Sequence, residues 1–408
     1  MKTKLFLTTF ALFALLLVGK LNAQFGGGNG TEADPYQITS KADMEALADS
    51  VNNGNYWSKD KHFKLMKDIN DSIRFCIGKY DEDNLSFPKA FQGNFDGNNK
   101  KITLALNFLF EGYVGLFNCV YNGIIENLVV DGYVNGIYSV GAICGYARNS
   151  YIINCTNYGK ISAIAQVGGI SGYNIEVDIS NCVNYGEINA TISTYSSAHI
   201  GGISGYNGKV NILNCVNYGN VNGDTFIGGI AGISNAKIIN CKNYGNVDGR
   251  TCVGGIIGHT EVGCNISYCV NSGSVTATNY GVGGIAGHFK GDTISYCVNI
   301  GTITGKKKTI NIYPSAEAGG IVGMGGFEKY EHFVSLIDKC INSGLVTGTT
   351  STGGIIGRAY NLDKVSNCIN TGAVSSSSGA MGCIAGEVEY GSTIINCHYD
   401  KQMCGGKD

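Results

Sequence analysis

Residues 152–172, IINCTNYGKISAIAQVGGISG, hold every part of a pattern that recurs along most of the chain. We number positions from the cysteine of this stretch, Cys155. Ile or Val stands at −3, Asn at +2, Gly at +4 and Ile or Val at +6, and a Gly-Gly-Ile-x-Gly element closes the unit. The units recur mostly every 26–29 residues. Their origins are Cys155, Cys182, Cys215, Cys241, Cys269, Cys297, Cys340, Cys368 and Cys397.

The repeat length and its apolar spacing decide the fold class. Each unit holds short apolar pieces rich in β-branched residues, separated by Gly or Asn, without a helical period. Such units stack so that neighbours bury a continuous core that one unit alone cannot form. The sequence therefore predicts an all-β, right-handed parallel β-helix of about ten three-strand coils, stacked about 4.8 Å apart.

The conserved spacing within a unit assigns residues to the interior. The −3 and +6 aliphatics are expected to fill the core, and the odd offset between −3 and 0 requires a bulge or corner. Asn at +2 can bond turn backbone, tolerate left-handed dihedrals or form a ladder of side chains. Gly at +4 and in the Gly-Gly pair permits positive φ or close backbone approach.

The ladder cysteines are expected to be core thiols. An earlier unit carries Leu128 at the cysteine position, and a site that accepts Leu is apolar. Ladder disulfides are the weaker alternative, and bridges among the off-ladder cysteines stay open, with no pairing indicated. Metal binding is disfavoured because no C-x-x-C pair occurs and His does not share the ladder.

The composition and the N-terminal segment limit the classes of protein to which the chain can belong. The chain has 408 residues with 61 Gly, 3 Pro, 44% hydrophobic and 15% charged residues, which excludes collagen-like and disordered chains. Residues 1–23, a lysine-bearing start followed by an apolar run, predict a cleaved signal peptide. The net charge of −2 disfavours a nucleic-acid binder. We expect an exported protein without an integral membrane span after cleavage.

The remaining segments flank the repeats. Residues 24–113 are expected to form an N-terminal α/β cap and the first coils, with a helix that Ser40 caps and a strand from Phe63 to Ile69. Residues 114–397 form the solenoid proper, and 398–408 a C-terminal tail.

The repeat resembles the GLUG motif. The resemblance rests on the Gly-Gly-Ile-x-Gly element, the Ile-x-Asn-Cys-x-Asn-x-Gly-x-Val string and the segment 30–40, and it covers nearly all of the mature chain. That motif occurs in secreted and surface proteins of bacteria, including non-catalytic regions of some immunoglobulin A metallopeptidases. It implies an adhesin-like β-helical surface protein. Peptidase activity does not follow, because the sequence has no His-Glu-x-x-His.

Candidate binding residues are tyrosines in two stripes and two long loops. Stacked aromatic side chains can hold sugar rings or a partner chain, and loops 304–318 and 324–336 flank one strand. The tyrosines are Tyr158, Tyr185, Tyr218 and Tyr244 at +3, Tyr146, Tyr173 and Tyr206 after the glycine element, and Tyr313 and Tyr330 in the loops.

No catalytic residue, metal ligand or cofactor is expected. The acids Asp178, Asp224, Asp248 and Asp338 occupy different positions in their units, so no pair on adjacent coils is indicated. We therefore expect a non-enzymatic, secreted or surface protein that binds an extracellular glycan or protein. A carbohydrate-active β-helix enzyme (polysaccharide lyase or glycosidase) and a structural spacer are the alternatives.

Overall fold

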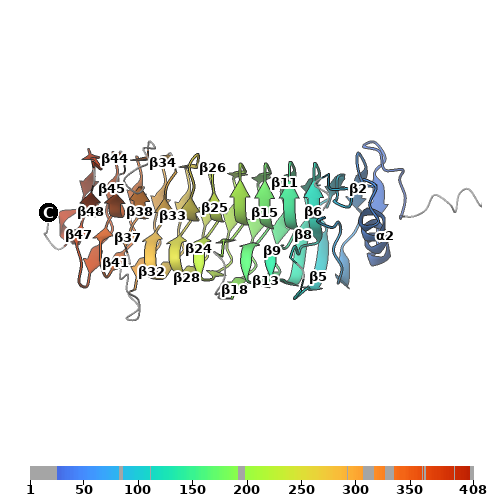
Figure 1. Ribbon diagram of the computed structural model, residues 1–408, viewed down its shortest axis with the longest axis horizontal. Coiled ribbons are helices and arrows are strands. Elements are labelled where there is room, and N and C mark those ends of the chain that lie inside the picture. The colour runs from blue at the N-terminus through green and yellow to red at the C-terminus, as the bar shows by residue number, and fades with distance from the viewer. Residues whose placement is uncertain are drawn as a thin grey trace, which may run out of the picture.

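The chain folds into an elongated parallel β-solenoid of about 12 turns. Figure 1 shows the coils stacked along one axis, with an α-helix at one end and the C-terminus at the other. This computed structural model describes residues 25–81, 86–110, 112–191, 198–291, 293–306, 317–326, 335–360, 362, 364–389 and 391–404. The signal peptide expected at residues 1–23 lies outside these ranges. Within them, no helix has the length and apolar character needed to cross a membrane.

Three parallel sheets run the length of the rod. Sheet A consists of β1 (Tyr36–Ile38), β2 (His62–Leu65), β4 (Asn94–Asp96), β7 (Ile124–Glu126), β11 (Tyr151–Ile153), β16 (Asp178–Ser180), β21 (Asn211–Leu213), β26 (Lys237–Ile239), β30 (Asn265–Ser267), β34 (Thr293–Ser295), β39 (Leu336–Asp338), β44 (Lys364–Ser366) and β49 (Ile394–Ile395). Sheet C consists of β6 (Phe117–Tyr121), β10 (Cys144–Arg148), β15 (Ser171–Ile175), β20 (Ser204–Gly208), β25 (Ala231–Ser234), β29 (Ile257–Thr260), β33 (Ala286–Phe289), β38 (Val322–Gly326), β43 (Ile356–Tyr360) and β48 (Ala385–Glu389).

Sheet B wraps the remaining sides of each coil. Its first ladder consists of β3 (Ile69–Ile73), β5 (Lys101–Asn107), β8 (Val129–Asn135), β12 (Thr156–Asn157), β17 (Val183–Asn184), β22 (Val216–Asn217), β27 (Lys242–Asn243), β31 (Val270–Asn271), β35 (Val298–Asn299), β40 (Ile341–Asn342), β45 (Ile369–Asn370) and β50 (His398–Tyr399). The rest are β9 (Tyr138–Gly141), β13 (Lys160–Ala163), β14 (Ala165–Gly168), β18 (Ile188–Ala190), β19 (Ile200–Gly201), β23 (Val221–Asn222), β24 (Thr225–Gly228), β28 (Val247–Gly254), β32 (Val275–Gly283), β36 (Ile303–Gly305), β37 (Ala318–Gly319), β41 (Val346–Gly348), β42 (Thr352–Gly353), β46 (Val374–Ser376) and β47 (Met381–Gly382).

The predicted corner between −3 and 0 lies at position −1. In the coil of Cys182, Ile179 points inward from β16, and Asn181 then adopts a left-handed φ of 54°. This turns the chain so that Cys182 also points inward before β17 begins. A left-handed residue recurs at −1 in every coil from Asn127 to Asn396. Asn suits this position because its short polar side chain tolerates αL.

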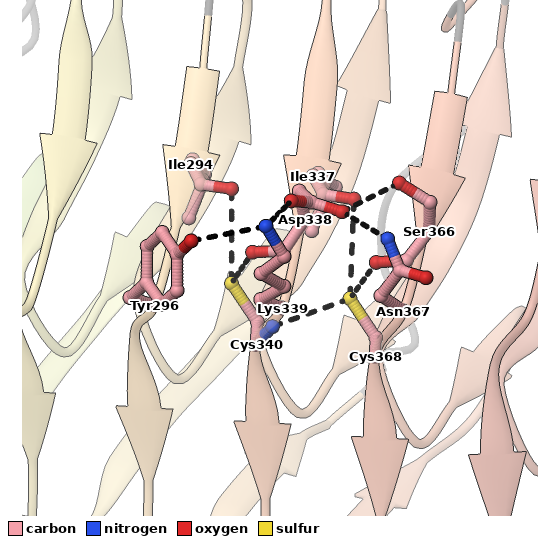
Figure 2. Close-up of polar contacts among 9 residues, drawn as sticks. All are labelled: Ile294, Tyr296, Ile337, Asp338, Lys339, Cys340, Ser366, Asn367 and Cys368. Carbon is pink, nitrogen blue, oxygen red and sulfur yellow. Dashed lines mark hydrogen bonds and ion pairs between the residues drawn. The ribbon is translucent and has the colours of Figure 1, made fainter.

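The ladder cysteines are free thiols in the dry interior, as predicted. Those from Cys155 to Cys368 have no exposed surface, and Cys397 is partly exposed. Figure 2 shows how the thiols are held: Cys340 donates to the carbonyl of Asp338 at 3.4 Å and to that of Ile294, one coil earlier, at 3.7 Å. Burial raises the pKa of the Cys155 thiol well above its ordinary value.

The +2 asparagines form a continuous hydrogen-bonded ladder inside the apolar core. Each is fully buried, and each Nδ2 donates to Oδ1 of the asparagine one coil later at 2.8 Å, from Asn157 through to Asn370. The same Nδ2 also donates to the carbonyl of the +4 glycine, for example Gly186 at 2.8 Å. Buried amides are thereby satisfied without water.

Close approach, and not positive φ, explains the +4 glycines. A Cβ on Gly186 would lie 1.9 Å from the carbonyl oxygen of Gly159 on the preceding coil. In the coils of Cys155 to Cys368, the left-handed φ occurs at −1, and neither the +2 asparagine nor the +4 glycine has a positive φ, whereas Gly132 at +4 of the Leu128 coil has a φ of 99°. Any side chain at +4 would therefore push adjacent coils apart.

Coil stacking begins earlier than the repeat pattern shows. Strand β1 pairs in parallel with β2, β2 with β4 and β4 with β7, which places Phe63 and Phe95 in line with Ile125. These early coils raise the number of turns from the expected ten to about 12. Helix α2 (Lys41–Asn52) is capped as predicted, with Ser40 Oγ accepting from the Asp43 backbone at 3.2 Å. At the other end, the tail forms a short 3-10 helix, η1 (Lys401–Cys404).

Candidate binding surface

The +3 tyrosines form one stacked column on the outside of sheet B. Tyr158, Tyr185, Tyr218 and Tyr244 are each 45–50% exposed. Successive ring centroids are 4.8, 4.8 and 5.0 Å apart, and the ring planes differ by only 3–8°. Each ring therefore covers the faces of its neighbours. What reaches solvent from the middle of the column is a row of ring edges and phenol hydroxyls.

Strand alternation places this column. The +2 asparagine points inward, so the +3 residue points outward, and the in-register pairing of β12, β17, β22 and β27 repeats it at the coil spacing. Stacking of like side chains along a parallel ladder adds to stability by itself. Within the column, the open aromatic faces are those of its two end members.

The second stripe lies on a different sheet and is less accessible. Tyr146, Tyr173 and Tyr206 occupy β10, β15 and β20 of sheet C. Tyr146 is only 4% exposed, because Phe87 and Tyr80 of the N-terminal segment pack over it. Burial raises its pKa to about 12.

Tyr146 therefore presents no ring to a ligand. Tyr173 and Tyr206 are half-buried and stack at 4.6 Å. The two stripes do not combine into one surface. Tyr313 and Tyr330, with most of their loops, lie outside the described residues.

A third aromatic stack was not predicted from the sequence. Tyr268 and Tyr296 occupy the −1 corner of two successive coils, stacked at 5.0 Å with planes 9° apart, and are 55% and 43% exposed. Lys339 follows at −1 in the next coil, and Figure 2 shows its Nζ bonded to the Tyr296 hydroxyl at 3.0 Å. The sequence carries a signal for this stack, because Asn fills position −1 in every unit except those of Tyr268, Tyr296 and Lys339.

A row of imidazoles continues the sheet C stripe. His259 and His288 lie in register on β29 and β33 with ring centroids 4.9 Å apart, and Phe226 bridges His259 to His199. Each histidine has one buried ring nitrogen without a hydrogen-bond partner. Desolvation lowers the pKa of His199 to about 4 and that of His259 to about 3, the latter with help from Lys290 and His199.

Three of the four acids considered as catalytic candidates have structural partners, and the fourth, Asp248, is exposed. Asp224 is 4% exposed, and Arg250 binds it with two bonds of 2.6 and 2.7 Å, which holds the pKa of that carboxyl below its usual range. Asp338 accepts from Ser366 and Asn367 at 2.7 Å each (Figure 2). Asp178 accepts from Asn211 at 2.8 Å.

Asp178 also lines a pocket of about 340 Å³ at the corner between sheets C and A. Its second acid, Glu176, lies 3.5 Å from Lys209 Nζ. In the described ranges, no three His, Cys, Asp or Glu side chains converge as metal ligands.

Comparisons with known proteins place the chain only coarsely. No protein-family model matches it, so the resemblance to GLUG-motif proteins stays a prediction. A stretch of 128 residues is 29% identical to "Putative Gly-rich membrane protein" of Evansella cellulosilytica, covering 30% of this chain and 14% of that protein. A stretch of 138 residues is 33% identical to Halomucin of Haloquadratum walsbyi, covering 32% of this chain and 1% of that protein.

Among solved structures, the chain is similar to a crystal structure described as a "putative immunoglobulin A1 protease" from Bacteroides ovatus. The identity is 20% and the TM-score 0.38, over 92% of this chain and 87% of that chain. The chain spans only a small part of the length of the two curated relatives, the Gly-rich membrane protein and Halomucin. What it does has to be argued from its own surface.

Proposed function

We propose that this chain is an exported, non-catalytic surface protein whose β-solenoid binds an extracellular glycan or protein partner. The observation that carries the proposal is the exposed tyrosine column from Tyr158 to Tyr244, held on a rigid scaffold. Aromatic and hydroxyl groups repeated at one coil spacing suit a partner that is itself extended and repetitive. One matched relative is named as a membrane protein, which agrees with a place at the cell surface.

The absence of catalysis is part of the proposal. It is supported by Asp224, Asp338 and Asp178, each held by hydrogen-bonding partners that fix it in the scaffold. General acid–base hydrolysis of a glycan needs two carboxyl groups flanking the bond to be cleaved. Structural engagement of these acids favours a binding role over a glycosidase or lyase.

The test screens the full chain against a glycan array and extracellular matrix proteins, and in parallel against polysaccharides for release of reducing or unsaturated ends. We expect binding without turnover. Tyr218→Ser should weaken binding, whereas Tyr133→Ser, an exposed tyrosine outside the stripes, should not. Turnover that an acid substitution abolishes would establish the enzyme instead. If no glycan or matrix protein binds, the chain is a structural spacer instead.

A further inference from the structure

Three outward ladders change character within two adjacent coils, those of Cys241 and Cys269. At +3, Tyr244 ends the tyrosine column and Ser272 follows. At −1, Asn240 is followed by Tyr268. At +1, Lys242 is the single lysine, arginine or acid in a row that otherwise holds Val129, Thr156, Val183, Val216, Val270, Val298, Ile341, Ile369 and His398. The three departures fall on two adjacent coils.

Strand pairing brings these positions together on one outer face. Lys242 pairs with Val270 across β27 and β31. The Ser272 backbone donates to the Asn243 carbonyl at 2.8 Å, which places Ser272 beside Tyr244. The Asn240 backbone donates to the Ser267 carbonyl at 3.0 Å, which places Asn240 beside Tyr268.

At this step two aromatic stacks end, and each leaves a ring face open. Tyr244 covers one face against Tyr218 at 5.0 Å, and its other face looks toward the small Ser272. Tyr268 covers one face against Tyr296 at 5.0 Å, and its other face looks toward Asn240. Both short neighbours leave the outer part of the ring uncovered. The open faces of the two rings thus border the same pair of coils.

The charge at this step is positive and unpaired. Lys242 is exposed, and no ion pair engages it among the residues that the structure describes. None of the outward residues at −1, +1 and +3 of the two coils is acidic. At the opposite end of the tyrosine column, Tyr158 lies beside Asp131 of the preceding coil, which forms an ion pair with Lys101 at 4.0 Å.

Backbone conformation adds an independent observation. Tyr268 and Tyr296 have φ of 56° and 53°, in a corner where Asn240 and Asn367 have 54°. A bulky aromatic residue is uncommon in the left-handed region, and such strain clusters at functional sites. The chain therefore keeps two exposed rings where the favoured residue is asparagine.

We propose that Lys242, Tyr244 and Tyr268 form a binding site for an acidic sugar residue of an extracellular glycan. The apolar face of the sugar stacks on an open tyrosine face, and its carboxylate pairs with the Lys242 ammonium. The inference rests on the proposed function and narrows its partner from glycan or protein to a glycan that carries uronic or sialic acid.

The test measures binding of the full chain to tetragalacturonate, a sialylated trisaccharide and their neutral counterparts, by calorimetry at low and high ionic strength. We expect at least one acidic glycan to bind about tenfold more tightly than its neutral counterpart, with the difference shrinking as salt rises. Lys242→Met should abolish that difference. Lys237→Met, which removes another exposed lysine of the same coil, should leave it intact.

Two tyrosine variants separate the ring faces from the fold. Tyr268→Asn restores the residue found at other −1 corners, so it should keep the melting temperature and lower the affinity about fivefold. Tyr244→Ser should act similarly, whereas Tyr133→Ser, an exposed tyrosine outside the stacks, should not.

The outcomes distinguish this site from the proposed function. If glycans bind and the Lys242, Tyr244 and Tyr268 variants bind equally well, this site is wrong and the proposed function stands. If neutral glycans bind best, the acidic assignment is wrong. If a polyglutamate peptide binds more tightly than any acidic glycan, and does so through Lys242, the sugar assignment is wrong. If no glycan binds, the site and the glycan arm of the proposed function both fall.

Discussion

The buried asparagine ladder gives the sharpest quantitative prediction. Asn217→Ala removes three hydrogen bonds of 2.8 Å: one accepted from Asn184, one donated to the Gly219 carbonyl and one donated to Asn243. All these groups lie in the dry core, where water cannot replace the lost partner. The three polar groups that bonded to Asn217 are therefore left buried without a hydrogen-bond partner.

The expected cost follows from the number of stranded groups. A buried polar group left without its partner costs about 1–3 kcal/mol. Asn184 keeps its bond to Gly186, so the lower half of that range applies to each bond. We expect Asn217→Ala to lower the free energy of unfolding by about 3–6 kcal/mol. The matched control, Asn222→Ala, loses one partly buried bond of 3.0 Å to Asn189 and should cost less than about 1 kcal/mol.

Two measurements read out the loss. Melting followed by circular dichroism compares the two variants, and hydrogen exchange with mass spectrometry locates the damage. Solenoids can lose cooperativity along their length, so local protection is the more direct quantity. Protection should fall in the coils of Cys182, Cys215 and Cys241 and remain elsewhere. A melting temperature of Asn217→Ala equal to that of Asn222→Ala would show that the buried asparagine ladder does not stabilise the core.

The other predictions concern coil spacing and acid stability. In Gly219→Ala the new Cβ would meet the Gly186 carbonyl oxygen at 1.9 Å, so we expect a loss of more than about 3 kcal/mol, whereas Gly112→Ala, with no atom within 4 Å, should be neutral in the same melting assay. The depressed pKa values of His199 and His259, about 4 and about 3, mean that the unfolded chain takes up protons first as pH falls below about 6.5. Their stabilisation is present above that pH and lost on acidification toward pH 4, by about 3 kcal/mol for His199 alone. His199→Phe, which copies Phe226 on the next coil, should flatten the melting-temperature profile between these pH values, and an unchanged slope would contradict the assignment.

The interior was predictable because periodicity reports on burial. Ile at −3, Cys at 0 and Asn at +2 recur together, and residues that recur in step on stacked coils must occupy equivalent environments. Leu128 at one cysteine position was enough to indicate a core thiol. Entry coils were expected within residues 24–113, but their register was not, because Phe63 and Phe95 replace the aliphatic residue and no cysteine follows.

The outer surface was less predictable because it depends on neighbours that do not repeat. Tyr146 occupies the same position in its unit as Tyr173 and Tyr206. Phe87 and Tyr80 nevertheless bury it, and they belong to the N-terminal segment, which does not show the repeat. The stacking of Tyr158 to Tyr244 followed from spacing, but the covering of ring faces needed the ring planes. Tyr268 and Tyr296 were missed because the corner position gained its meaning only once the left-handed φ was known.

Native-state thiol labelling tests most directly whether successive coils stack in parallel around a shared core. The full chain is treated with iodoacetamide before and after denaturation, and each cysteine is scored by mass spectrometry. We predict that Cys155 to Cys368 of the ladder stay reduced and unlabelled until the chain unfolds, whereas the partly exposed Cys76 reacts in the native protein. Labelling of the ladder thiols at the rate of Cys76, or their recovery as disulfides, would show that they do not share a buried core.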